Sequence, residues 1–402
     1  MSISEWNNLP DTVVLLIFSF IEQHHLYETA VFACKKWYRC FSDPGNWVHV
    51  KLSFLQADTT AELSQLRWLQ LYGRHIRSID VHLNQFNAEN RLRSVQALEL
   101  ANTICNRLEK IRVVFDGENP LFYAGQEFAG PLMQLLTCTM DDYRKVVLQK
   151  IDFGRMQIMF TDVVLSPLLS DGYAVRLRYL NIQNRQLICR VPQDFVLMLV
   201  SCCRSLIDLR CFHSSFSEAA AQVFAEPSRE QLRHLSLLAQ GQERINLVAI
   251  SDESWLALRV ACPRLRVTLK FDVRCPSGFV RNTLSAPNIP LCHLFLESYS
   301  ARSVVHEELQ FVAQNYGETL EKLVVQSQAS EPLDRMLIKV IRSARLLRSL
   351  HVLCILHPET IRIIEEAFPS LIHSLHFTIK SQLEPHPWVS DEILDKLFVP
   401  GW

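Results

Sequence analysis

Histidine, cysteine and glycine are the residues through which this chain could most directly carry out chemistry. The sequence of 402 residues contains 14 histidines, 12 cysteines and 11 glycines. The histidines are scattered, and we interpret the pair His24-His25 as a solvated helix break. No two cysteines have the Cys-x-x-Cys spacing of zinc ribbons or dithiol redox sites. Cys202, Cys203 and Cys262 fall on apolar faces, where a free cysteine behaves as a small hydrophobic residue.

Catalytic sequence motifs are also missing from the chain. It contains no Gly-x-Ser-x-Gly, P-loop, His-Glu-x-x-His or Gly-x-Gly-x-x-Gly string. A cysteine that acted as a nucleophile would need a base and an exposed setting, and nothing in the sequence nominates one. We therefore predict no catalytic residue, no metal ligand and no cofactor.

Composition narrows the class of protein further. The chain is 49% hydrophobic and 21% charged, which is typical of a globular protein. Its net charge of −1 gives no indication of a nucleic-acid partner. The N-terminus has no positively charged signal-peptide start, and no run reaches the roughly 18 apolar residues of a membrane span. We expect a soluble protein with reduced thiols in the cytoplasm, the nucleus or both.

After residue 50 one apolar pattern recurs through the chain. The pattern apolar-x-x-apolar-x-apolar is the strand signature of leucine-rich repeats. Its units start at Ile76, Leu108, Leu148, Leu177, Leu206, Leu232, Leu291, Leu320, Leu347 and Ile372. An eleventh unit, Leu265/Val267/Leu269/Phe271, fits with a shifted register. The mean spacing of about 30 residues lies near the long end for such repeats.

Helical segments separate these units. Ranges 58–72, 303–316 and 358–368 have apolar residues at helical spacing, and Ser251 and Glu331-Pro begin two more helices. An ordinary α/β domain would not predict eleven similarly spaced units, so we favour a solenoid whose stacked units bury a continuous core. The asparagine expected after each strand is in place only at Asn84, and residues 116–149 carry extra length. We therefore expect an uneven second repeat.

In the first fifty residues the apolar positions recur at helical spacing instead. Pro10 and Asp11 suit a helix start, and Val13, Val14, Ile17, Phe18 and Ile21 form one apolar face. A second helix is expected over about 26–32 and a third over about 34–41.

The order of residues in this segment resembles the F-box. The resemblance rests on Leu9-Pro10, Ile17-Phe-Ser-Phe-Ile21, Leu26, Ala30-Val-Phe-Ala-Cys-Lys-Lys-Trp-Tyr-Arg39 and Trp47. It implies an α/β protein with a three-helix F-box over 4–50. A leucine-rich-repeat solenoid would follow over 51–402, with a parallel concave sheet, helices on the convex side and a C-terminal cap.

The F-box resemblance implies a named partner. F-boxes bind the adaptor Skp1, which docks on cullin-1 carrying a RING subunit. The residues that would contact Skp1 are Leu9, Pro10, Ile17, Phe18, Leu26, Val31 and Trp37. In so small a motif, Trp37 and Trp47 could equally brace the F-box core and its junction with the repeats.

The target of such a protein would lie on the concave face of the repeats. Residues between the apolar template positions point there because side chains alternate along a strand. We expect the target to be held by Asp152, Asn181, Arg210, Phe212, Phe295, Val324 and His351. Phe212, Phe295 and Val324 are unusual on a polar face, and exposed aromatics are typical of recognition hot spots. Loops and the tail 386–402, which we interpret as a cap on the last repeat, are competing sites.

The sequence thus favours a substrate-recognition subunit of a Skp1–cullin–F-box ubiquitin ligase that acts by proximity and leads to degradation of an unknown protein. The alternative is a non-degradative scaffold bound to Skp1. We predict no enzyme activity, no nucleic-acid partner and no membrane partner.

Overall fold

The computed structural model describes residues 8–21, 26, 31–55, 59–116, 125–137, 148–156, 161–183, 191–240, 248–272, 275–297, 305–354 and 356–367. The chain splits into two compact units, Met1–Gln186 and Leu187–Trp402. The domain boundary predicted near residue 50 marks a change in the spacing of apolar residues, whereas the division at residue 186 separates compact units. The boundary near residue 50 stays a prediction.

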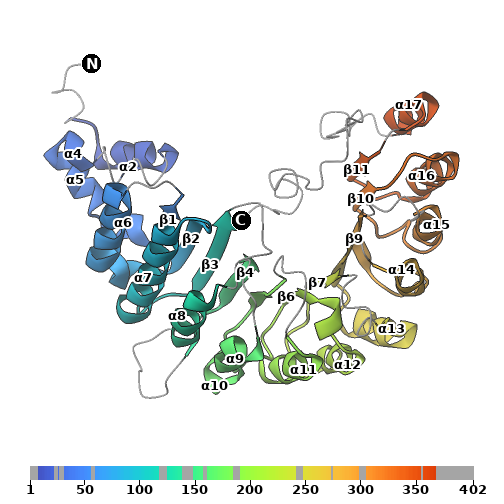
Figure 1. The fold of residues 1–402 in the computed structure, drawn as a ribbon, viewed down its shortest axis with the longest axis horizontal. Coiled ribbons are helices and arrows are strands. Elements are labelled where there is room, and N and C mark those ends of the chain that lie inside the picture. Colours follow the sequence, from blue (N-terminus) through green and yellow to red (C-terminus); the bar gives the residue numbers. More distant parts are fainter. Residues whose placement is uncertain are drawn as a thin grey trace. The chain divides into compact units, whose positions relative to one another are not determined.

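The first unit begins with short helices and continues as strands that alternate with helices (Figure 1). The short N-terminal elements are α2 (Asp11–Phe20), α4 (Val31–Ala33), α5 (Lys35–Phe41) and η2 (Pro44–Trp47). The strands are β1 (His49–Phe54), β2 (Ser78–Asn84), β3 (Lys110–Asp116), β4 (Lys150–Arg155) and β5 (Tyr179–Asn181). The connecting helices are α6 (Thr59–Tyr72), η3 (Gly73–His75), α7 (Ala88–Ile104), α8 (Gln126–Leu136), α9 (Asp162–Leu165), η4 (Ser166–Leu169) and α10 (Asp171–Ala174).

The second unit repeats the alternation of strand and helix. Its strands are β6 (Asp208–Phe212), β7 (His234–Ala239), β8 (Arg266–Phe271), β9 (Leu291–Glu297), β10 (Lys322–Gln326) and β11 (Ser349–Leu353). Its helices are α11 (Gln193–Cys202), η5 (His213–Ser215), α12 (Glu218–Phe224), α13 (Asp252–Ala261), α14 (Ser277–Leu284), α15 (His306–Asn315), α16 (Glu331–Ser343) and α17 (Pro358–Ala367).

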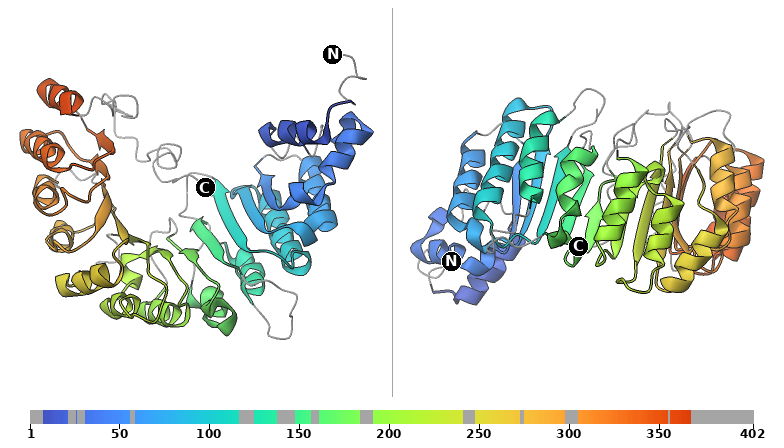
Figure 2. Two further views of the ribbon diagram at one scale, coloured as in Figure 1. Left: turned by 180° about the vertical axis from the view of Figure 1, so that it is seen from behind. Right: turned by 90° about the horizontal axis from the view of Figure 1, so that it is seen from below.

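Within each unit the strands form a parallel sheet in chain order, and the helices lie along one face of it (Figures 1 and 2). The apolar template positions pair in register, as Ile79 with Ile111 and Ile111 with Ile151. These side chains are buried between sheet and helices, where they form the core. An α/β fold of leucine-rich-repeat-like units is therefore confirmed. We call the sheet face opposite the helices the strand face.

One strand was missed by the sequence pattern. Strand β1 directly follows η2, and its Val50, Leu52 and Phe54 are buried with the alternation of a strand. It pairs with β2 from His49 to Phe54. Strand β1 lacks the leucine that begins most units of the pattern, but it still buries alternate side chains. The repeat sheet therefore starts directly after the N-terminal helices.

Irregularities occur close to where they were expected. The β3–β4 pairing shifts register between Arg112 and Val114, and α8 lies in the extra length that precedes β4. The β8–β9 pairing shifts between Val267 and Thr268, in the unit whose leucine register is itself shifted. Because of this second shift, Thr268 pairs with His293 and Lys270 pairs with Phe295.

Helix starts follow their local sequence. The Ser251 side chain accepts a hydrogen bond from the Ser254 amide at 3.2 Å, and Ser330 caps α16 one residue before its Glu331-Pro start. None of the helices within the described ranges is long and apolar enough to cross a membrane. The predicted unit at Ile372 and the tail 386–402 lie outside the described residues.

Candidate functional site

Helix α2 has two apolar faces where the sequence predicted one. Val14 and Phe18 are buried, whereas Val13, Leu16 and Phe20 are exposed. These three side chains are three and four residues apart, so they share one side of the helix. Phe20 is 82% exposed and Leu16 is 58% exposed. We call Val13, Leu16 and Phe20 the outer face of α2.

The inner face of α2 packs on α5. The Phe18 ring meets the Trp37 ring edge to face at 5.5 Å. The Asp11 carboxylate accepts two hydrogen bonds from the Arg39 guanidinium, at 3.0 and 3.1 Å. The slight burial of Asp11 acts to raise its pKa, but the neighbouring Lys36 and Arg39 outweigh it and lower that pKa. These contacts fix the orientation in which α2 presents its outer face.

An aromatic cluster joins the N-terminal helices to the first repeat helix. Trp47 is buried, stacks on Tyr72 of α6 at 4.3 Å and meets Phe41 edge to face at 5.0 Å. The Trp47 indole N–H donates to the Phe41 carbonyl at 2.9 Å, and the Tyr72 hydroxyl donates to Ser42 at 3.0 Å. Trp47 therefore braces this junction, which was one of its two predicted roles. The cluster thereby joins α5 and η2 to α6.

The seven residues predicted to contact Skp1 are in different environments. Pro10 is exposed, Leu9, Ile17 and Trp37 are half-buried, and Phe18 and Leu26 are buried. Phe18 and Leu26 line a pocket of about 240 Å³ with Trp47. Val31 lies in α4, and its side chain is outside the described set. The contact assignment stays a prediction for all seven.

The outer face of α2 was not predicted from the sequence. A signal was present, because seven of the ten residues of this helix are apolar. A helix so rich in apolar residues has more than one face to bury. Phe32 of α4, at 76% exposure, was overlooked in the same way.

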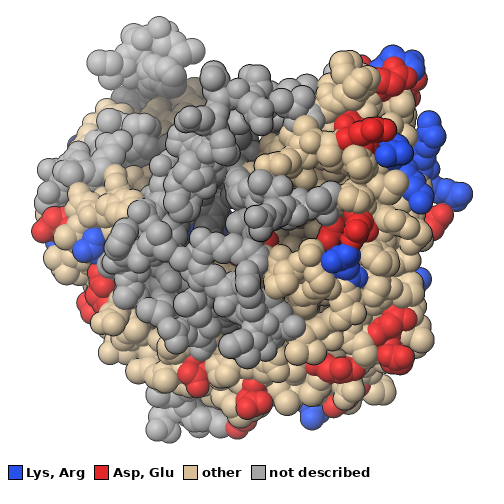
Figure 3. Space-filling model, turned by 45° about the vertical axis from the view of Figure 1, so that its right-hand side comes forward, with Lys and Arg blue, Asp and Glu red and all other residues tan. Residues whose placement is uncertain are grey.

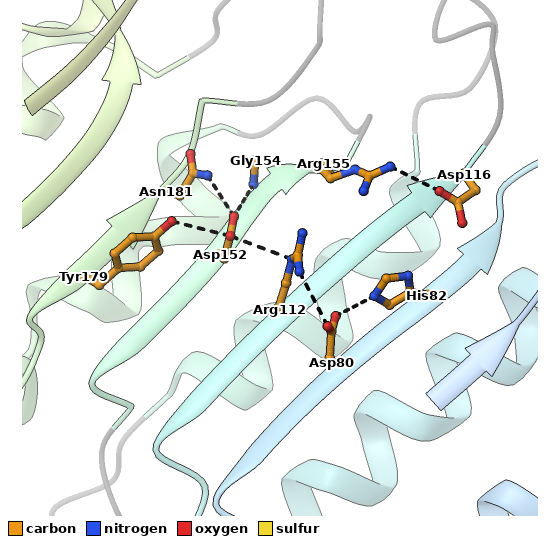
Figure 4. Close-up of polar contacts among 9 residues, drawn as sticks. All are labelled: Asp80, His82, Arg112, Asp116, Asp152, Gly154, Arg155, Tyr179 and Asn181. Carbon is orange, nitrogen blue, oxygen red and sulfur yellow. Dashed lines mark hydrogen bonds and ion pairs between the residues drawn. The ribbon is translucent and has the colours of Figure 1, made fainter. Parts of the chain in front are cut away.

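On the strand face of the first unit, charged side chains alternate in sign across the strands. Asp80, Arg112 and Asp152 pair in register across β2, β3 and β4, and Asn181 of β5 follows (Figure 4). We call these four residues the charge ladder. Arg112 lies 3.6 Å from Asp80 and 3.9 Å from Asp152. Cross-strand pairs of opposite charge stabilise a sheet by roughly 0.2–1 kcal/mol each.

Asp152 is the most enclosed member of the charge ladder. Its Oδ1 accepts hydrogen bonds from the Asn181 side chain at 2.8 Å and from the Gly154 amide at 3.0 Å. The Tyr179 hydroxyl lies 3.4 Å from Oδ2 (Figure 4). The structure thus brings together the predicted target residues Asp152 and Asn181, but it also engages them with each other. A target that used them would have to compete with these bonds.

The remaining predicted target residues lie on the second unit. Phe295, Val324 and His351 pair in register across β9, β10 and β11. Arg210 donates to both carboxylate oxygens of Asp208, at 3.2 and 3.3 Å, and shares β6 with Phe212.

The expected exposure of the apolar members is wrong. Phe212, Phe295 and Val324 are 2–3% exposed. For Phe295 a reason is visible, because the ammonium groups of Lys270 and Lys322 lie 6.0 and 5.6 Å from its ring centroid. Long basic side chains therefore cover this ring. The predicted role of these three residues in target binding stays untested.

The described residues were compared with the side-chain groups that hold metal ions in proteins. None of them form a group of three or more His, Cys, Asp or Glu side chains placed to hold a metal ion. Cys105 and Cys203 are thiols outside any disulfide, and burial raises the pKa of each to about 12. A thiol with so high a pKa is a poor nucleophile at neutral pH.

On the view in Figure 3, acidic and basic side chains of the described residues are scattered among other residues.

Comparisons with known proteins agree with these observations. A family model described as F-box-like matches residues 6–53. The F-box/LRR-repeat protein 8 of Mus musculus is 26% identical over 382 residues, which cover 95% of this chain and 97% of that protein. The Homo sapiens protein of the same name is 25% identical over 380 residues, which cover 94% and 96%.

Among solved structures, a Bacteroides fragilis protein aligns over 85% of this chain and 76% of its own, at 12% identity and a TM-score of 0.35. A likeness this weak carries no argument about function.

Proposed function

We propose that this chain, an F-box protein with leucine-rich-repeat-like units, is the substrate-recognition subunit of a Skp1–cullin–F-box ubiquitin ligase. Such adaptors are non-catalytic in general, and the F-box in general binds a partner of the Skp1 type. Under this proposal the F-box holds Skp1 and, through it, cullin-1 with its RING subunit. The strand face holds a protein that is then ubiquitinated and degraded. The proposed place of action is the cytoplasm, the nucleus or both.

The observation that carries the proposal is the outer face of α2. It lies within the matched F-box-like segment and presents Leu16 and Phe20 to solvent. Large apolar side chains that line up on one exposed helix face mark a protein-binding surface. Burying them against an adaptor would supply the hydrophobic part of the binding free energy.

The aromatic cluster at Trp47 suits a subunit that works by proximity. Ubiquitin transfer in such a complex is catalysed elsewhere, so the recognition subunit contributes by holding its target at a defined place. A loose joint between F-box and first repeat would spread the target over many positions. Stacking of Trp47 on Tyr72 removes that freedom at the junction.

Co-purification with Skp1 and cullin-1 tests the proposal. We expect the wild-type chain to retain both proteins, and a Leu16→Asp/Phe20→Asp variant to lose both. A matched control is Val163→Asp/Val175→Asp, because Val163 and Val175 are 62% and 71% exposed in the same unit but lie outside the F-box segment. This control variant should retain Skp1.

Two outcomes would count against the proposal. Retention of Skp1 by the Leu16→Asp/Phe20→Asp variant would remove α2 as the contact surface. Capture of Skp1 without cullin-1 would favour the non-degradative scaffold instead. Proximity labelling with and without a proteasome inhibitor then identifies target proteins, which should accumulate around the chain when the proteasome is blocked.

A further inference from the structure

Arginine supplies most of the positive charge of this chain, and lysine is scarce. Of the 41 lysines and arginines, 11 are lysine and 30 are arginine. The two residues carry the same charge, have similar helix propensities and lie mostly at protein surfaces. They differ in reactivity, because a lysine amine that loses its proton is a nucleophile, whereas the guanidinium of arginine stays protonated in proteins. An excess of arginine therefore keeps the charge of a surface but removes amines that could react.

The lysines of the described repeats lie almost entirely on the strand face. Five of them are on strands, namely Lys51 (β1), Lys110 (β3), Lys150 (β4), Lys270 (β8) and Lys322 (β10). Each is next to a buried core side chain of its own strand, so it points to the face opposite the helices. On the described helices from α6 to α17, Lys339 of α16 is the single lysine, and it is exposed.

Arginine occupies the other basic positions of these helices. Arg67 of α6, Arg259 of α13 and Arg342 of α16 are all exposed. Their guanidinium groups have no hydrogen-bond or ion-pair partner among the residues that the structure describes. A lysine at any of the three would keep the charge and the helix propensity. Local packing therefore does not require arginine at these positions.

Ion pairing explains arginine only in some places. The Arg362 guanidinium of α17 donates two hydrogen bonds to Glu359, at 2.6 and 3.0 Å. Lysine cannot reproduce such a forked contact. Arg335 of α16 has a single exposed ion pair, to Glu331 at 3.6 Å. A pair of this kind contributes little to stability, and a lysine can also form it. The preference for arginine on the helices therefore has a cause other than ion pairing.

Ubiquitin transfer is a reaction that distinguishes the two residues. The ε-amino nitrogen of lysine attacks the carbonyl carbon of the thioester that joins ubiquitin to a cysteine of the conjugating enzyme. The new C–N bond forms as the C–S bond breaks, the nitrogen gives up a proton, and the cysteine leaves as a thiol. A protonated guanidinium has no lone pair for this attack.

We propose that arginine, in positions where lysine would also fit, makes the helix side of the repeats a poor acceptor of the ubiquitin that the chain's own complex delivers. Lys339 is then the acceptor site that remains on the described repeat helices. This inference rests on the proposed function, because the chain is exposed to ubiquitin transfer only as a subunit of a ligase.

A reconstituted reaction measures ubiquitin attachment to the chain itself. The full-length chain is purified with Skp1, cullin-1 and the RING subunit and is supplied with ubiquitin, ATP, the activating enzyme and a conjugating enzyme. Mass spectrometry of tryptic peptides then locates the isopeptide bonds. For the wild type, we expect attachment on the helices α6 to α17 to occur at Lys339, and Lys339→Arg should abolish it.

Added lysines test the role of arginine. The Arg67→Lys/Arg259→Lys/Arg342→Lys variant should raise the rate of attachment on these helices roughly threefold or more, because three exposed amines join the one at Lys339. The matched control is Arg67→Gln/Arg259→Gln/Arg342→Gln, which removes the same guanidinium groups without adding amines. This control should react at the wild-type rate. Circular dichroism and Skp1 co-purification report whether each variant is folded.

The possible failures can be told apart. Equal rates for the lysine and glutamine variants, in complexes that retain cullin-1, would overturn the inference and leave the proposed function intact. An absence of the isopeptide bond at Lys339 after prolonged reaction would overturn the assignment of that acceptor. Failure of the wild-type chain to retain cullin-1 would instead overturn the proposed function, and this inference with it.

Discussion

Replacing Gly154 with alanine tests whether Asp152 and Asn181 are held in place for the stability of the sheet. A Cβ atom at Gly154 would lie 2.3 Å from the Asn181 Nδ2 atom and 2.8 Å from its Cγ atom. Neither distance is compatible with van der Waals contact, so the Asn181 side chain has to move. Its movement breaks the 2.8 Å hydrogen bond to Asp152, which is buried.

The size of the effect follows from the lost bond. A hydrogen bond to a charged group contributes about 1.5–3 kcal/mol to stability. Alanine restricts the unfolded chain more than glycine does, and this entropy effect alone raises the stability of the folded state by about 0.4–1 kcal/mol. The Gly154 amide still donates to Asp152. We expect a net loss of about 1–2 kcal/mol, and roughly 2–4 °C in Tm per kcal/mol for a unit of this size.

A double-mutant cycle measures the coupling between the two positions. Urea unfolding is followed for the wild type, Gly154→Ala, Asn181→Ala and the double variant. With the Asn181 amide gone, Gly154→Ala should cost little, so the coupling free energy should reach about 1 kcal/mol or more. Gly130→Ala on α8 is the matched control, because a Cβ there meets nothing within 4 Å. It should leave stability unchanged or raise it by up to about 1 kcal/mol.

Additivity would refute this reasoning. If Gly154→Ala costs the same with and without the Asn181 side chain, to within about 0.5 kcal/mol, then the close approach of Asn181 does not explain the glycine.

Three further predictions concern single side chains. Phe20→Ala should weaken Skp1 binding by about 2 kcal/mol, or roughly 30-fold by calorimetry, and should leave stability nearly unchanged. Phe18→Ala should instead destabilise the fold by about 3–5 kcal/mol. If the two variants had the same effects on Skp1 binding and on stability, α2 would not have separate inner and outer faces. Trp47→Ala should lower stability by about 3–5 kcal/mol in urea unfolding, because it removes the ring stacked on Tyr72; a loss below about 1 kcal/mol would show that the junction is not braced there. Burial lowers the pKa of His213 to about 4, so the unfolded chain binds more protons between pH 6.5 and 4 and stability should fall as the pH is lowered through that range. His213→Phe should remove that part of the slope when urea unfolding at pH 7 and pH 4.5 is compared, and an unchanged slope would assign it to other groups.

Local patterns in the sequence were sufficient to predict most of the architecture. Leucine spacing located β2 to β11 because alternate side chains of a strand must enter one core, a rule that acts over a few residues. Ser251 and Glu331-Pro located helix starts for the same local reason. The unit at Leu265 has a shifted leucine register in the sequence, and in the structure the β8–β9 pairing shifts in the same unit. The F-box order of residues was likewise readable, since it rests on side chains close together in the chain.

Only the tertiary structure decided which side chains remain available at the surfaces. The helical pattern of α2 could not show that Val14 and Phe18 are buried while Leu16 and Phe20 face solvent, because that depends on how the neighbouring elements, among them α5, pack on α2. The position of β1 depended in the same way on pairing with β2. The charges of Asp152, Lys270 and Lys322 were visible in the sequence. The hydrogen bond of Asn181 to Asp152 and the placing of Lys270 and Lys322 near the Phe295 ring depend on strand register, which brings together residues dozens of positions apart.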